Sequence, residues 1–296
     1  MGVNNLQPST WYLPTGFVFS QSSLQDYVDC QRRFQLRYIQ RRAWPALDTA
    51  PALESELFMQ RGAQFHHLVH QYLLGIPVEK LARQIEGDEM LVRWWMNFTS
   101  LTGFGNLSGF NARPEISLSA PLGGFRLMAK YDVIVLPPNA SPSGKGERVT
   151  IYDWKTSHKR PKREWLEKKL QTRVYPYLLA RAGAQLNGGP PIEPEQIEMI
   201  YWFTDFPDQP ARFAYNTEQF AADEAYLSGL IAELQSLGDG PALLTEDEYR
   251  CNYCPYRSLC SRGDKAGLLV EMGDFGEVET GFEFEFDFEG IGEIEF

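Results

Sequence analysis

A carboxylate and a lysine lie two residues apart at the end of an apolar run near the middle of this chain. Residues 149–152 are β-branched and aromatic, which predicts a strand that continues through Asp153 and Lys155. Side chains on a strand alternate between its faces, so Asp153 and Lys155 share one face while Trp154 lies on the other. A carboxylate binds hard divalent cations, and a nearby ammonium stabilises charge on an attacking water or a phosphate. The pair therefore suits cation-assisted hydrolysis of a phosphodiester.

Two neighbouring segments help to decide between a chemical site and an ordinary surface ion pair, which the same tripeptide often forms. Residues 125–136 predict a second strand, in which Asp132 is surrounded by apolar residues. A charge in so apolar a strand needs a partner or a metal ion, because burying an isolated charge is costly. Residues 161–181 predict a helix that carries Gln171 and Tyr175 four residues apart on one face. This context favours the chemical site.

These residues together resemble the site pattern of the PD-(D/E)XK nucleases, in the branch of RecB-type exonucleases. That branch commonly has Gly-x-x-Asp, then Asp-Tyr-Lys-Thr, then Gln-x-x-x-Tyr. The matching positions here are Asp132, Asp153, Lys155, Gln171 and Tyr175. Ala129 replaces the glycine of the pattern, and Trp154 replaces its first tyrosine. A further family element, a helix with a metal-binding histidine, matches Gly62-x-x-x-His66.

The resemblance implies a fold, an activity and a role for each matching residue. The implied fold is α/β, a restriction-endonuclease-like core whose central mixed sheet is flanked by helices. The implied activity is metal-dependent hydrolysis of DNA, by an exonuclease at single-stranded ends. Lys155 would stabilise the transition state, and Gln171 and Tyr175 would position Lys155 and the DNA strand. The implied ligands of Mg²⁺ or Mn²⁺ are His66, Asp132, Asp153 and the backbone carbonyl of Trp154.

The chain has four cysteines, Cys30 and the three of CNYCPYRSLC: Cys251, Cys254 and Cys260. In an intracellular chain, cysteines are more often ligands than disulfide partners, and four thiolates suit either zinc or an iron–sulfur cluster. The run resembles the ending of 4Fe-4S nucleases, including CRISPR-adaptation exonucleases and AddB nuclease domains. The segment from Cys30 resembles their amino-terminal Cys-Pro-Arg-Arg-Phe, with Gln31 in place of proline. The resemblance favours a 4Fe-4S cluster that joins the amino-terminal and carboxyl-terminal segments.

The net charge of −11 is concentrated at the carboxyl terminus. Residues 271–296 contain ten of the 39 acids and no lysine or arginine, which leaves 29 acids against 28 bases in the rest. The bases cluster in residues 30–42 and 155–173, where they suit a phosphate backbone. Arg33, Arg37 and Arg41 would form one ridge of a helix over residues 20–42. We expect DNA contacts from Arg33, Arg37, Arg41, Lys159, Arg160, Lys162, Arg163 and Arg173.

The acidic tail alternates phenylalanine with acids between Phe282 and Phe288. Such low-complexity composition is typical of disorder. Two functional interpretations stay open: a segment that docks on a partner, and a DNA mimic that covers the basic clusters. The domain organisation is therefore an extension over residues 1–19, a nuclease domain over 20–269 and a tail over 270–296.

The elements that must position the site follow from periodicity and turn residues. Helices are predicted over 57–74, 89–101, 161–181 and 217–237. Residues 20–42 predict either one helix or two helices joined by a turn, beginning near Ser22 or Ser23. Strands are predicted over 113–120 and 125–136, as a hairpin, and over 149–155, 197–203 and 211–215. Loops are predicted over 43–56, 103–111 and 137–146. Glu115, at the start of the hairpin, offers a carboxylate to a metal, although a surface role is the simpler interpretation.

Several function classes are disfavoured. No apolar run approaches the roughly 18 residues of a membrane span. The first residues have no basic start or apolar core of a secretion signal, which predicts a cytoplasmic protein without membrane partners. No nucleotide-binding fingerprint is present, so a helicase or integrase activity would come from a partner. The competing class is a non-catalytic iron–sulfur subunit that binds DNA ends, but such a module needs neither Asp153 nor Lys155.

Overall fold

The computed structural model describes residues 11–42, 50–100, 111–137, 148–238, 240 and 242–263, without the side chains of 50–56 and 253. The acidic tail over 270–296 lies outside these residues. So do residues 1–10 of the predicted extension, and most of the predicted loops: residues 43–49, 103–110 and 138–146.

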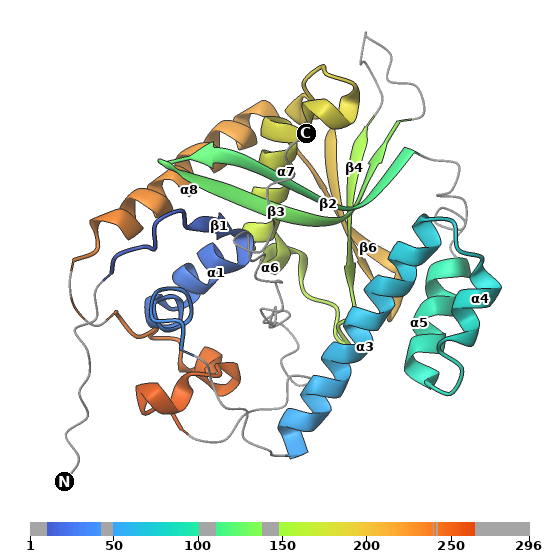
Figure 1. Cartoon of the computed structure of the whole chain (residues 1–296), viewed down its shortest axis with the longest axis horizontal. Coiled ribbons are helices and arrows are strands. Elements are labelled where there is room, and N and C mark those ends of the chain that lie inside the picture. The colour runs from blue at the N-terminus through green and yellow to red at the C-terminus, as the bar shows by residue number, and fades with distance from the viewer. Residues whose placement is uncertain are drawn as a thin grey trace, which may run out of the picture.

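A six-stranded mixed sheet forms the centre of the molecule (Figure 1). Its path runs β1, β3, β4, β5, β6, and β2 pairs with β3. The β1–β3 and β4–β5 pairs are parallel and the others antiparallel. The bounds are β1 Val18–Ser20, β2 Asn111–Leu122, β3 Phe125–Leu136, β4 Val149–Lys155, β5 Ile197–Phe203 and β6 Phe206–Ala214. The predicted mixed sheet and hairpin are confirmed, while β1 was not predicted.

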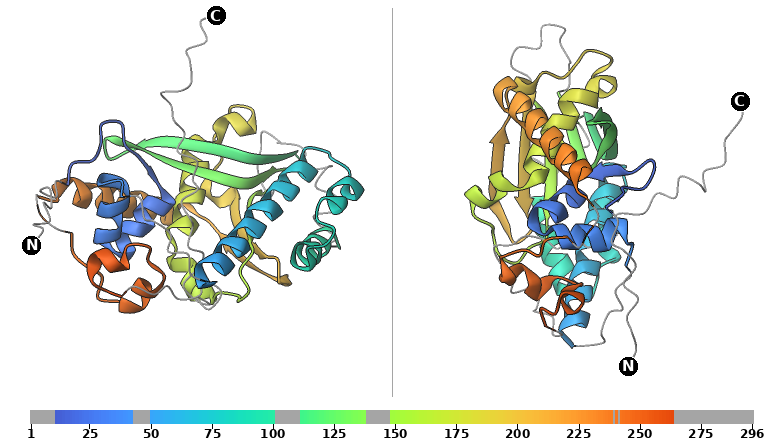
Figure 2. Two further views of the ribbon diagram at one scale, coloured as in Figure 1. Left: turned by 60° about the horizontal axis from the view of Figure 1, so that its bottom comes forward. Right: turned by 90° about the vertical axis from the view of Figure 1, so that its left-hand side faces the viewer.

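Helices cover both faces of the sheet (Figure 2). One face packs on α1 (Gln21–Asp29), α7 (Leu170–Ala182) and α8 (Thr217–Ser236) in a core that we call the α7 cluster; it includes Tyr177, Leu178 and Tyr201. The other face packs on α3 (Ala50–Leu73), α4 (Val78–Arg83) and α5 (Glu89–Ser100) in the α3 cluster, which includes Phe65, Trp94 and Trp202. This confirms the predicted flanking helices.

The side-chain alternation of the β2–β3 hairpin shifts by one residue partway along, and Ile134 and Leu136 continue the α7 face of β3 beyond the shift. The first half of β3 packs into the α7 cluster through Leu127, Ala129 and Tyr131. Beyond Asp132 the alternation shifts by one residue, and Val133 and Val135 pack into the α3 cluster. On β2, Ile116 and Leu118 contact the α7 cluster, whereas Ala112 contacts the α3 cluster. The shift in side-chain alternation therefore lies at Glu115 on β2 and at Asp132 on β3.

Of the two predictions for residues 20–42, separate helices joined within the segment are confirmed and one continuous helix is wrong. Ser20 caps α1, because its side chain accepts from the N–H of Ser23 at 3.1 Å, so the helix begins at Gln21. Cys30 is extended (φ −165°, ψ 107°) and separates α1 from α2 (Gln31–Phe34). A π-helix, η1 (Gln35–Ile39), follows and ends the helical segment before Arg41.

Three other helix boundaries differ from the prediction. The helix over 161–181 is two helices, α6 (Arg163–Lys168) and α7, because Lys169 is extended between them. α3 already begins at Ala50, so the loop predicted over 43–56 is wrong for its last seven residues. α4 was not predicted. The carboxyl-terminal region forms two short 3-10 helices, η5 (Glu248–Tyr253) and η6 (Arg257–Cys260).

Candidate active site

Strand β4 and helix α7 bring three of the predicted residues into direct contact. Lys155 Nζ lies 2.9 Å from Asp153 Oδ2, and Gln171 Nε2 donates to Asp153 Oδ1 at 2.6 Å. All three are almost fully buried, with exposures of 6%, 4% and 3% for Lys155, Asp153 and Gln171. The prediction that Asp153 and Lys155 share a strand face is confirmed. On the opposite face, the rings of Tyr152 and Trp154 stack at 5.6 Å.

Asp132 on β3 adjoins this group. Its Oδ2 accepts from the backbone N–H of Trp154 at 2.8 Å, and its Oδ1 lies 3.2 Å from Nδ1 of His66. Burial by itself raises the pKa of Asp132, but His66, the Trp154 N–H and the charge of Lys155 outweigh burial and lower that pKa. Asp132 is therefore held ionised, as a cation ligand must be.

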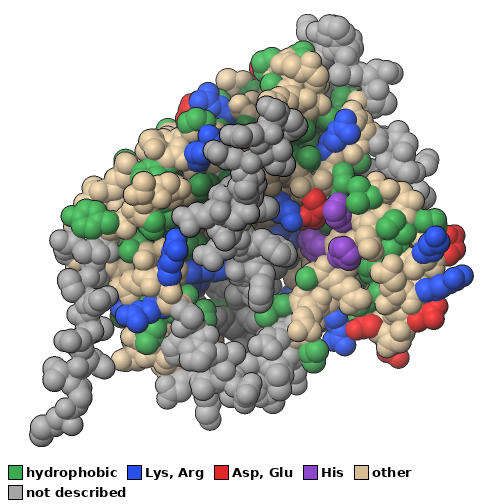
Figure 3. All heavy atoms as spheres, in the orientation of Figure 1, with side chains coloured by type: hydrophobic (Ala, Val, Ile, Leu, Met, Phe, Trp, Pro, Cys, Tyr) green, Lys and Arg blue, Asp and Glu red, His purple; other side chains and the backbone are tan. Residues whose placement is uncertain are grey.

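Helix α3 reaches the sheet because Gly62 lacks a side chain. A Cβ at Gly62 would lie 3.0 Å from Oγ1 of Thr156, the residue after β4. This close approach sets His66, one turn later, against Asp132. The spacing Gly-x-x-x-His therefore has two roles: the glycine lets α3 approach the sheet, and the histidine one turn later lies beside Asp132. Thr156, which the glycine approaches, was not singled out from the sequence. Figure 3 shows histidine, acidic and basic side chains gathered near the middle of this face.

Tyr175 lies in the core behind the site. It is 5% exposed, and its ring centroid is 4.8 Å from that of Tyr131. The hydroxyl of Tyr131 donates to the backbone carbonyl of Tyr175 at 2.8 Å, which ties α7 to the residue before Asp132. In this arrangement Tyr175 acts on the position of β3, and its predicted contact with DNA stays a prediction.

The donor set suits a hard divalent cation. Asp132, Asp153 and His66 supply two carboxylates and an imidazole. Oε1 of Gln171 is buried and has no hydrogen-bond partner among the described residues, so a water on a cation would satisfy it. In the part of the chain that is described, no three His, Cys, Asp or Glu side chains are grouped closely enough to hold a metal ion. Cation binding would therefore require side chains to exchange their present partners.

The four cysteines lie at a seam between the chain's two terminal regions. Burial raises the pKa of Cys251, Cys254 and Cys260, that of Cys254 to about 11, and the neighbouring Cys30 thiol contributes to each rise. All four are free thiols. Four thiolates are a donor set that suits zinc or an iron–sulfur cluster. In this structure, however, the cysteines, all of them among the described residues, are not grouped closely enough to hold a metal ion.

Hydrogen bonds and an ion pair support the same seam. The N–H of Arg32 donates to the carbonyl of Leu243 at 3.2 Å, and the hydroxyl of Tyr256 donates to the carbonyl of Arg42 at 3.1 Å. Nη1 of Arg250 lies 2.5 Å from Oδ1 of Asp29. Residues between Leu243 and Tyr256 thus contact the amino-terminal segment from Asp29 to Arg42, as the predicted joining of the two segments requires.

The arginines expected on DNA divide into two groups. Arg33 and Arg37 pair with Asp26 at 2.7 and 3.0 Å, and Arg173 pairs with the fully buried Asp223 at 2.7 Å. Arg41 is left-handed (φ 45°) beyond the helix, so the predicted three-arginine ridge is wrong.

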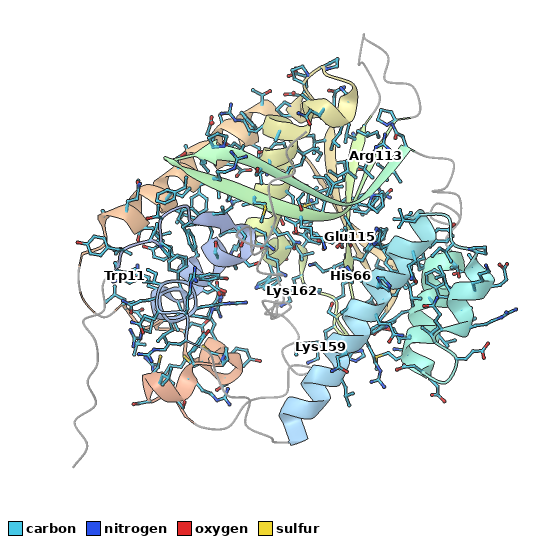
Figure 4. The ribbon with its side chains drawn as sticks, in the orientation of Figure 1. Trp11, His66, Arg113, Glu115, Lys159 and Lys162 are labelled. Atoms are coloured by element: carbon cyan, nitrogen blue, oxygen red, sulfur yellow. The ribbon has the colours of Figure 1, made fainter. Side chains whose placement is uncertain are left out.

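The remaining predicted contacts follow β4 (Figure 4). Arg160 and Arg163 donate to backbone carbonyls of Gln209 and Arg212 on β6. Lys159 and Lys162 are exposed, and they are the better candidates for phosphate.

Comparison with known proteins identifies the class. The family model of the PD-(D/E)XK nuclease superfamily matches residues 18–261, so the chain belongs to that superfamily. Members of the superfamily typically use a divalent metal. No curated protein matches the chain.

Two of the solved structures that resemble this chain illustrate the similarity. One is described as SSO0001, with 14% identity and a TM-score of 0.39 over 83% of this chain and 87% of that one. The other is described as a "Putative exonuclease" from Eubacterium rectale, with 9% identity and a TM-score of 0.45 over 86% of this chain and 92% of that one. Separately, none of the described helices has the length and apolar character to cross a membrane.

Proposed function

We propose that this chain is a metal-dependent deoxyribonuclease that acts on single-stranded ends. The observation that carries the proposal is the buried network of Gln171, Asp153 and Lys155 beside the pair of Asp132 and His66. A buried ion pair adds little stability compared with apolar residues of the same size, and losing one partner is costly. Its presence next to a second carboxylate supports a chemical role.

The residues would divide the work of hydrolysis as follows. Asp132, Asp153, His66 and the carbonyl of Trp154 would hold Mg²⁺ or Mn²⁺. The cation would polarise the phosphoryl oxygens and lower the pKa of a bound water. Lys155, buried on the same strand face as Asp153, would stabilise charge on the phosphate or on the attacking water. Gln171 would keep the Asp153 carboxylate in its orientation through the 2.6 Å hydrogen bond.

The substrate assignment rests on charge and on the resemblance to RecB-type exonucleases. Lys159 and Lys162 are exposed and follow β4, which ends at the buried Lys155, so they would meet a phosphate backbone. The biological setting would be DNA repair and recombination or CRISPR adaptation, with a helicase or integrase as partner. A 4Fe-4S cluster on Cys30, Cys251, Cys254 and Cys260 would fasten the terminal seam.

Separating cleavage from binding tests the proposal. In the full chain with Mg²⁺ or Mn²⁺, we expect Asp153→Asn or Lys155→Ala to lower the rate of single-strand digestion by at least about a hundredfold. Binding to the same oligonucleotide should stay within a few fold of the parent, because phosphate contacts come from other residues. Lys80→Ala, an exposed lysine on α4, is the control and should digest at the parental rate.

The alternative, a non-catalytic subunit that binds DNA ends, gives a different pattern. It predicts no digestion by the parent protein at any cation concentration and unchanged DNA binding in every variant. Parental activity in Lys155→Ala would instead show that hydrolysis occurs elsewhere.

A further inference from the structure

Glu115 has an unusual backbone conformation for a residue inside a strand. Its φ of 54° lies in the left-handed region that residues with a side chain rarely adopt. The other described non-glycine residues of this kind, Arg41 and Ser261, lie beyond helix ends. Such strain persists only where the surrounding structure imposes it, and it is concentrated at functional sites. The conformation of Glu115 therefore points to a functional constraint on its side chain.

The strand register sets Glu115 against the predicted cation site. The residues on either side of Glu115 pair with those on either side of Asp132, so the two acids face each other across the hairpin. Opposed residues in an antiparallel pair have Cα atoms roughly 4.5–5.5 Å apart. Both acids lie where the side-chain alternation of the hairpin shifts by one residue. Figure 4 shows Glu115 next to His66, where α3 passes the hairpin.

The Glu115 carboxylate is held by an exchangeable partner. It forms an ion pair with Nζ of Lys130, and the side chains of Lys130 and Glu115 are 55% and 24% exposed. An exposed lysine pair is weak and its ammonium is mobile. The same arrangement recurs at the other two acids, since Asp132 faces His66 and Asp153 faces Lys155. Each carboxylate is thus paired with a basic side chain of the protein at a position where a metal ion would supply positive charge.

The amide of Gln171 is independent evidence that this cluster takes a further polar ligand. Gln171 is only 3% exposed, and its Oε1 has no hydrogen-bond partner among the described residues. Its Nε2 is committed to Asp153. A buried acceptor of this kind calls for a donor, which a water in a cation's coordination shell would provide.

We propose that Glu115 is a third carboxylate of the cation site, and that it binds the cation by releasing Lys130. The proposal rests on the proposed function, because it adds a ligand to the site of Asp132, Asp153 and His66. The ligand is a hard divalent cation, which prefers several oxygen donors and binds more tightly as carboxylates are added. Released Lys130 then presents its ammonium to a phosphate at the same edge of the hairpin.

Binding of Mn²⁺ alone, without DNA, provides the test. Titration of the full chain with MnCl₂, followed by the electron paramagnetic resonance signal of unbound Mn²⁺, gives the Kd independently of cleavage. We expect Glu115→Gln to weaken binding by about 10–100-fold, the range seen when groups supporting a metal site are removed. Lys130→Met should have the opposite effect and tighten binding, because it removes the competing ammonium.

Two further variants make the test robust. Glu115→Gly removes the carboxylate and relieves the left-handed strain, so it should lose Mn²⁺ affinity while its melting temperature stays at or above the parental value. Glu198→Gln removes a carboxylate that pairs with Arg148 and Arg212 near the start of β5. Its Mn²⁺ affinity should be unchanged.

The outcomes separate this proposal from the proposed function. Parental affinity in Glu115→Gln and Glu115→Gly, together with loss of binding in Asp132→Asn, would overturn the role of Glu115 and leave the site standing. Parental affinity in Asp132→Asn as well would contradict the site itself. Weakened binding in Lys130→Met would show that the pair with Lys130 supports the site instead of competing for Glu115.

Discussion

Replacing Lys155 with methionine isolates the energetic cost of the buried charge pair. Lys155 and Asp153 are 6% and 4% exposed and 2.9 Å apart, so solvent screens them little. Without the ammonium, the buried Asp153 carboxylate loses its paired charge, although the hydrogen bond from Gln171 remains. Removing one partner of a buried pair costs about 3–5 kcal/mol.

This cost converts into a measurable melting shift. For a domain of this size, 1 kcal/mol corresponds to about 2–4 °C, so Lys155→Met should melt about 6–20 °C below the parent. Adding Asp153→Asn removes the uncompensated charge, and replacing both partners of a buried pair is often neutral or stabilising. The double variant should therefore recover most of the loss, while cleavage stays abolished in both.

Calorimetry at one scan rate, in EDTA and under anaerobic conditions, measures the shift. Lys130→Met is the matched control, because the same substitution at a half-exposed ion pair should change stability by no more than about 1 kcal/mol. A melting temperature of Lys155→Met equal to that of the control, or a double variant less stable than Lys155→Met, would refute the reasoning.

Three further outcomes are expected. Truncation at Val270 should tighten DNA binding at low salt and lose this gain as salt rises, if the acidic tail competes for the basic segments; binding that is equal across the salt series would exclude the DNA mimic. The proposed 4Fe-4S cluster would colour the anaerobically prepared protein brown, and Cys30→Ala should remove this colour and lower thermal stability, because the proposed ligands join both ends of the domain. One zinc per colourless parent protein, prepared anaerobically with iron supplied, would contradict the cluster. Replacing Lys159 and Lys162 with alanine should reduce the slope of log binding constant against log salt concentration by about two, as measured in an equilibrium salt series. Arg173→Gln should instead lower stability and leave that slope unchanged.

The parts of the fold that the sequence predicts are those set by local periodicity. The hairpin, β4 and β5 have apolar patterns and turn residues within their own segments, and all three are confirmed. The shared face of Asp153 and Lys155 follows from the strand period alone. His66 and Asp132 were expected from the family resemblance to hold the same cation, and the structure brings them within 3.2 Å of each other.

The parts that the sequence did not predict depend on distant partners. Arg33, Arg37 and Arg173 look like a phosphate-binding surface in sequence, but they pair with acids up to 50 residues away. The break at Cys30 lies where that residue meets the carboxyl-terminal segment, a contact across the whole domain. The left-handed conformation of Glu115 lies where the side-chain alternation of the hairpin shifts, and no local sequence pattern predicted either feature.

Cation-dependent digestion of an end-labelled single strand tests directly whether this chain is a metal-dependent nuclease that acts on single-stranded ends. The full chain, prepared anaerobically, is incubated with linear and circular single-stranded DNA in Mg²⁺, Mn²⁺ or EDTA. We expect digestion of the linear strand in Mg²⁺ or Mn²⁺, none in EDTA, resistance of the circle, and loss of digestion in Asp153→Asn. An intact linear strand in both cations, or equal digestion by Asp153→Asn, would contradict this expectation.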